Sequence, residues 1–138
     1  MGLFFGKNEA RAQVMLDCLS AYVRQYAASH PAAEGRIAWV VSETEERISA
    51  MSGAELRKLM RTAGASAEHC ALDVLMDRVL YWIQRPSADE GARDDSGPLF
   101  EMWNDLNDCL FRKGYISRKE HDKKRETGEL LSQIRAPF

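Results

Sequence analysis

Histidines and cysteines, the side chains best suited to metal binding and nucleophilic chemistry, are few and scattered in this sequence. The histidines are His30, His69 and His121, and the patterns His-x-x-x-His, Glu-x-x-His and Cys-x-x-Cys do not occur. No single helix therefore offers two metal ligands one turn apart, as many zinc sites do. Phosphate-binding and dinucleotide-binding glycine motifs are absent as well. The sequence predicts neither a metal site nor a bound cofactor.

The cysteines and the acidic residues likewise do not form a pattern that is typical of a catalytic site. Three cysteines stand in apolar helical patterns, which predicts buried, inert thiols in a reducing compartment: Cys18, Cys70 and Cys109. The acidic cluster Glu43, Glu45 and Glu46 is more typical of a solvated helix face than of a general acid and base, because neighbouring carboxylates on a helix diverge. We therefore expect a protein that is not an enzyme.

Composition bounds the class of protein. The chain has 138 residues, is 45% hydrophobic and 29% charged, and carries a formal net charge of -2. This is enough for one ordinary domain without a metal or disulfide staple. The charge lacks the overall basic excess of a dedicated nucleic-acid binder, although local basic faces remain. No apolar run suits a membrane span and no secretion signal is visible, so we expect a cytoplasmic protein with no membrane contact.

Hydrophobic periodicity of three and four predicts an all-α fold, a single bundle of five to six helices without a sheet. Residues 36 to 41 would suit a strand, but the spacing continues to Met51 and no second strand is available for pairing. The expected helices span about 8–30, with Asn8 as the cap, then 36–51, 53–64, 66–85, 98–114 and 118–134. Capping boxes are expected at Ser52 with Glu55 and at Ser117 with Glu120. Residues 86–98 are expected to form a mobile acidic loop within one domain, residues 1–138.

One segment, ELRKLMRTAGAS followed by AEHCALDV, resembles the first half of the helix-turn-helix of Cro and CI-type repressors. Leu56 and Leu59 would face inward, Gly64 would make the turn, and Ala71 would let two helices pack. The resemblance implies a DNA-binding regulator over about residues 54–85. LMDRVLYWIQR, however, continues the second helix where a further turn and a recognition helix should follow. The candidate DNA contacts under this alternative are Arg57, Lys58, Arg61 and Arg78.

A second segment, LFRKGYISRKEHDKKRETGELL, is similar to the short helical hairpin at the C-terminal end of many bacterial proteins, which implies interaction or oligomerisation at most. Its second helix carries a basic cluster with interleaved carboxylates: Arg118, Lys119, Lys123, Lys124 and Arg125. This cluster is either a self-compensated solvated face or a docking face for an acidic partner. Phe4 and Phe5 precede the expected first helix, and they either staple the end of the bundle or anchor another chain.

The leading hypothesis is a small cytoplasmic protein that acts by binding another protein, as an adaptor, regulator or inhibitor of the kind found in phages and mobile elements. Its candidate contacts are Phe4, Phe5 and the basic cluster of residues 118–125. A homodimer is compatible with this hypothesis. The alternative is the DNA-binding regulator with a degenerate helix-turn-helix.

Overall fold

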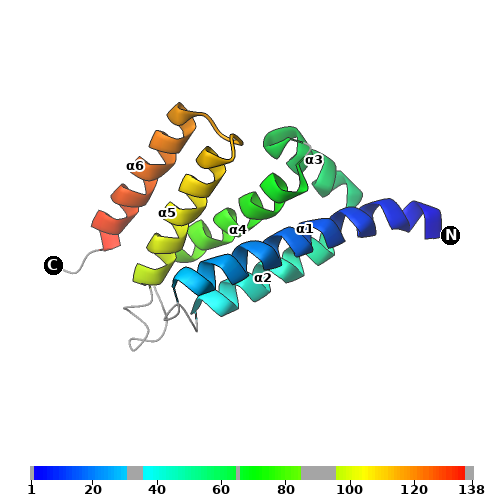
Figure 1. Cartoon of the computed structure of the whole chain (residues 1–138), viewed down its shortest axis with the longest axis horizontal. Helices are drawn as coiled ribbons and strands as arrows, with labels where there is room; N and C mark the ends of the chain where they lie inside the picture. The colour runs from blue at the N-terminus through cyan, green and yellow to red at the C-terminus, as the bar shows by residue number, and fades with distance from the viewer. Residues whose placement is uncertain (1, 31–35, 65, 85–95, 136–138) are drawn as a thin grey trace. The chain divides into compact units, whose positions relative to one another are not determined.

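The computed structural model describes residues 2–30, 36–64, 66–84 and 96–135, with side chains described over 9–30, 37–64, 66–84 and 97–131. Across these ranges it contains six α-helices and no strand, so the all-α prediction is confirmed (Figure 1). The helices are α1 Gly2–Ser29, α2 Arg36–Ala50, α3 Gly53–Ala63, α4 Ala67–Ile83, α5 Ser96–Arg112 and α6 Arg118–Arg135.

The internal contacts divide the chain into two units, Met1–Leu75 and Met76–Phe138. The first unit holds α1, α2, α3 and the beginning of α4, and the second holds the rest of α4 with α5 and α6. Because α4 runs through the boundary without a break, the single-domain organisation stays a prediction that needs an unfolding experiment.

In the first unit, α1 and α2 pack side by side and run antiparallel (Figure 1). Each contributes a stripe with the three-and-four spacing of a helix face: Met15, Leu19, Tyr22 and Tyr26 from α1, and Ile37, Val40, Thr44 and Ile48 from α2. The Thr44 hydroxyl, although buried, donates to the Val40 carbonyl over 2.8 Å, so this polar group is satisfied.

The N-terminal boundary of α1 was predicted wrongly. The helix begins at Gly2, so Asn8 lies inside it and does not cap it. A residue that is able to cap a helix permits a start there but does not force one. Phe4 and Phe5 consequently belong to α1 and do not precede it; their side chains lie outside the described ones.

The capping boxes and the turn glycine were predicted correctly. Ser52 and Glu55 exchange hydrogen bonds at the start of α3, the Glu55 N–H reaching Ser52 Oγ over 3.2 Å and the Ser52 N–H reaching Glu55 Oε1 over 3.2 Å. Gly64 follows α3 with a φ of 72°, a conformation that favours glycine. Ser66 then accepts from the His69 N–H over 3.2 Å and caps the start of α4.

The predicted loop at 86–98 can be compared with the structure only at its last three residues, 96–98. Residues 85–95 lie outside the described ones. Ser96, Gly97 and Pro98 form the first turn of α5, so the loop ends earlier than predicted. Pro98 fits there because the N–H that it lacks would have no helical acceptor in the first turn.

In the second unit, α5 and α6 form an antiparallel hairpin (Figure 1). The spacing of Leu99, Trp103, Leu106 and Leu110 predicts a buried stripe on α5, widened by Phe100, Met102 and Phe111. These four residues and Met102 are buried together with Cys109, whereas Phe100 and Phe111 are only half-buried. This hairpin positions the candidate site.

Candidate functional site

Two side chains of α5 donate hydrogen bonds to the backbone of α6. Trp103 Nε1 donates to the Lys124 carbonyl over 3.0 Å, and Asn107 Nδ2 donates to the His121 carbonyl over 2.8 Å. Both donors belong to residues that are buried. Because losing a partner for a buried donor is costly, the two bonds fix the register of α6 against α5.

The buried imidazole of His121 forms a third link. Its Nε2 lies 2.7 Å from Asp108 Oδ1 on α5, and its Nδ1 lies 3.6 Å from Asp122 Oδ1 on α6. The ring stacks on Phe111 with 4.7 Å between centroids. His121 is thus a structural side chain of the hairpin, in contact with two carboxylates and an aromatic ring.

Gly128 allows the helices to approach closely. A Cβ added to Gly128 would lie 2.8 Å from Trp103 Cδ1 and 2.9 Å from Trp103 Nε1. The indole therefore occupies the space beside the glycine backbone, which only a residue without a side chain leaves open.

The predicted basic cluster separates into two groups in the structure. Lys124 and Arg125 face the hairpin: the Lys124 ammonium lies 5.9 Å from the Trp103 ring centroid, and the Arg125 guanidinium lies 3.6 Å from Asp108 Oδ1. Lys119 and Lys123 are exposed, and within the described residues neither forms an ion pair. The fifth member, Arg118, is exposed and places its guanidinium 5.8 Å from the Phe111 ring centroid.

The turn between α5 and α6 is locked at both ends. The Tyr115 N–H bonds to the Leu110 carbonyl over 2.9 Å and the Gly114 N–H bonds to the Phe111 carbonyl over 3.0 Å, while Gly114 has a φ of 77°. This is a Schellman motif, which satisfies the last carbonyls of α5. The predicted capping box at Ser117 and Glu120 then starts α6, with the Glu120 N–H bonding to Ser117 Oγ over 3.1 Å.

Two exposed cations at this turn, Arg112 and Lys113, are missing from the predicted site. They stand immediately before the turn glycine, and Arg118 and Lys119 stand immediately after the turn. A hairpin brings such flanking positions to one end, so the signal was present in the sequence RKGYISRK.

The candidate DNA contacts lie on two different elements. Arg57, Lys58 and Arg61 are exposed along α3, and they form no ion pair within the described part of the chain. Arg78 belongs to the second unit, where its guanidinium lies 3.3 Å from Asp77 and 4.5 Å from the Tyr81 ring centroid. The α4 helix is continuous to Ile83, and nine of its side chains are buried, of which only His69 is polar: His69, Cys70, Ala71, Leu72, Val74, Leu75, Met76, Val79 and Ile83. It thus offers few polar groups to base edges.

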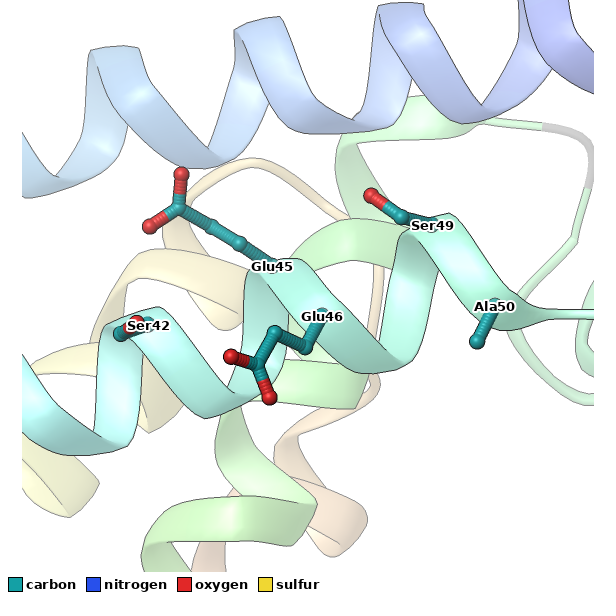
Figure 2. A pocket seen from close by; sticks show the side chains of 5 residues that line it. All are labelled: Ser42, Glu45, Glu46, Ser49 and Ala50. Atoms are coloured by element: carbon teal, nitrogen blue, oxygen red, sulfur yellow. The ribbon is translucent and has the colours of Figure 1, made fainter.

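The acidic face of α2 forms a shallow, open hollow lined by Ser42, Glu45, Glu46, Ser49 and Ala50 (Figure 2). All five residues belong to one helix, and the carboxylates of Glu45 and Glu46 point in different directions. The arrangement is that of a solvated face, since the two exposed carboxylates diverge and every lining residue belongs to α2.

The cysteines and the side chains that could bind a metal do not form a functional site among the described residues. Cys70 and Cys109 are buried as predicted, whereas Cys18 is only half-buried. Burial raises the pKa of the Cys70 thiol, although the nearby Arg11 guanidinium opposes the shift. Among the described residues, no group of three or more His, Cys, Asp or Glu side chains is placed to hold a metal ion. None of the described helices has the length and apolar character needed to cross a membrane.

Comparisons with protein-family models, with curated protein sequences and with solved structures find no match to this chain. The argument for function therefore depends on the geometry described above.

Proposed function

We propose that this chain acts by binding another protein, without chemistry of its own, and that the exposed side of α6 is a docking face. The observation that supports this proposal is the division of the basic cluster. Lys124 and Arg125 are used to hold the hairpin, while Lys119 and Lys123 project from it without an ion-pair partner among the described residues.

The physical argument is one of preorganisation. Binding costs less free energy when the contact residues sit on an element that does not have to become ordered. The α6 helix is fixed by the Trp103 and Asn107 hydrogen bonds and by the contact of His121 with Asp108. Lys119 and Lys123 are four residues apart and therefore share one face of this fixed helix.

Co-purification from the cells that make the protein tests the proposal. The tagged wild-type chain should retain a stable companion, and the double reversal Lys119→Glu/Lys123→Glu should release it. The matched control is Arg24→Glu/Arg47→Glu, which makes the same change in net charge at exposed positions of α1 and α2 and should retain the companion. A wild-type chain that purifies as a lone monomer, or equal loss in both variants, would overturn the proposal.

The second candidate is DNA binding, favoured by the three exposed cations of α3. Arg57, Lys58 and Arg61 could contact phosphates, which supply most of the affinity of non-specific DNA binding. A gel-shift assay at about 50 mM salt decides the matter, because even non-specific binding is detectable there. Retardation that Arg57→Gln/Arg61→Gln abolishes would support this candidate, and failure to retard any duplex would exclude it.

A further inference from the structure

We infer that, when no other protein is bound, the exposed face of α6 pairs antiparallel with α6 of a second copy of this chain. We call this surface the α6 face and define it by Lys119, Lys123, Glu126 and Leu130. The inference goes beyond the proposed function, because it says what covers the same side of the helix in the free chain.

The four residues of the α6 face form one stripe along the helix. They are separated by four, three and four positions, the spacing with which side chains of one helix meet a partner helix in a coiled coil. All four are exposed, whereas His121 and Gly128, which contact α5, are buried. The stripe therefore lies on the side of α6 that faces away from α5.

Leu130 gives the α6 face an apolar end. Its side chain is 59% exposed, the largest exposure among the large hydrophobic residues whose burial the structure describes. Covering it would remove apolar surface from water, which favours association. A lysine is suited to this contact, because its hydrocarbon stem can lie along an apolar side chain while the ammonium stays in water.

The charged groups of the α6 face are not paired within one chain. Among the described residues, Lys119, Lys123 and Glu126 form no ion pair. The charge changes sign along the stripe, from two cations near the start of α6 to a carboxylate further along. The best complement is therefore a helix on which the same charges follow each other in the opposite direction.

An antiparallel copy of α6 is such a helix. When Lys123 of one chain lies opposite Glu126 of the second copy, the two-fold axis of the dimer forms the same pair again. Each Lys119 then lies opposite Leu130 of the other copy, because the spacing of four, three and four reads the same in both directions. A parallel copy would place equal charges opposite each other, which repulsion disfavours.

The α6 helix is already ordered for this contact. The hydrogen bonds from Trp103 and Asn107 hold it against α5, so pairing does not have to order the backbone. The contact buries one leucine from each copy and otherwise joins exposed charges, whose pairs contribute little each. The dimer is therefore weak and depends on concentration, and a protein that binds α6 more tightly displaces the second copy.

Sedimentation velocity at about 50 mM salt tests the inference. The wild-type chain should be monomeric at about 10 µM and should shift towards a dimer at about 500 µM. Lys123→Glu and Glu126→Lys should each weaken association by at least about tenfold, since each replaces two attractive contacts with two repulsive ones. An equimolar mixture of the two variants should regain association close to that of wild type, because the reversed charge at position 123 then faces the reversed charge at position 126.

The matched control is Arg47→Glu, which makes the same change in net charge as Lys123→Glu at an exposed position of α2 and should associate like wild type. Circular dichroism confirms that each variant is folded. Three results would overturn the inference: a wild-type chain that stays monomeric at about 500 µM, a dimer that either reversal leaves intact, or a mixture of the two variants that stays monomeric. The proposed function is tested separately. A chain that dimerises but retains no companion on co-purification would refute the proposed function and leave this inference standing.

Discussion

At the residue scale, the contact between Gly128 and Trp103 sets how closely α5 and α6 approach. Glycine lowers the intrinsic stability of a helix interior by about 1 kcal/mol relative to alanine. In this hairpin that cost is offset because the buried Trp103 ring lies where a Cβ would be and donates a hydrogen bond to the Lys124 carbonyl.

Gly128→Ala should therefore destabilise the protein by about 1 kcal/mol, since an overpacking cost of about 1–3 kcal/mol exceeds the gain in helix propensity. Urea unfolding followed by circular dichroism measures the change. Gly97→Ala is the matched control, because no atom lies within 4 Å of a Cβ built at Gly97. If both alanines stabilise the protein to the same extent, the close contact with Trp103 is wrong.

The cysteines make a second prediction at this scale. Burial raises the pKa of Cys70 above its ordinary value of 9.0 in spite of the nearby Arg11. Iodoacetamide at pH 8 should therefore alkylate half-buried Cys18 faster than buried Cys70 in the folded protein, with similar rates in denaturing urea. Peptide mass spectrometry measures both rates, and equal rates in the folded protein would refute the assignment.

The raised pKa of Cys70 also determines how this group makes the stability of the protein depend on pH. As the pH rises past about 9, the unfolded chain loses the Cys70 proton before the folded chain does. Ionisation then favours the unfolded state, so the contribution of this group to stability is complete below pH 9 and is lost above it.

At the element scale, the boundaries of α3 and α6 are set by local hydrogen bonds. Ser117→Ala removes the side chain that accepts from the Glu120 N–H and should cost about 0.5–2 kcal/mol of unfolding free energy. Ser49→Ala, at an exposed position of α2, should change stability by less than about 0.5 kcal/mol. Chemical denaturation of the two variants compares the costs, and equal effects would contradict the capping role of Ser117.

Local features of this kind were predictable from the sequence. The capping boxes, the turn at Gly64 and the buried stripe of α5 depend on residues within about one helical turn of each other. The faces of α1 and α2 were less predictable. Val14 lies in the run of apolar residues spaced by three and four along α1, yet it is 48% exposed. On α2 the spacing Ile37, Val41, Thr44 predicts that Val41 faces the core, but Val40 is the buried one and Val41 is half-buried. Adjacent apolar residues leave such a choice to tertiary packing.

The candidate site divides in the same way. The sequence located the basic residues of α6, but it did not show that Lys124 and Arg125 face Trp103 and Asp108 of another helix. The sequence prediction also left Arg112 and Lys113 out of the site. These two cations lie at the same end of the hairpin as Arg118 and Lys119 only after α5 and α6 have folded against each other. Contacts between helices depend on their register, which hydrogen bonds such as Asn107 to His121 determine.

At the scale of the whole molecule, α4 contributes to both contact units. A continuous helix shared in this way predicts one cooperative unfolding transition, as in a single domain. Circular dichroism and tryptophan fluorescence should give the same urea midpoint, with Trp39 reporting on the first unit and Trp82 and Trp103 on the second. Two separate midpoints would show that the units unfold independently.

The net charge of -2 conceals an uneven distribution over the elements. Among the described residues, exposed cations stand close together in sequence on α3 (Arg57, Lys58 and Arg61) and at the start of α6 (Arg118 and Lys119), whereas α2 carries exposed carboxylates. Such a pattern governs which partners are attracted more than it governs stability. This is why the proposal for function rests on where the charges lie and not on their sum.

The central claim, that the exposed side of α6 docks another protein, is tested most directly by photo-crosslinking in the cells that make the chain. A benzophenone amino acid placed at Lys119 should form one discrete adduct with a second protein, and the same probe at exposed Gln25 on α1 should form none. No adduct from position 119, or equal adducts from both positions, would contradict the claim.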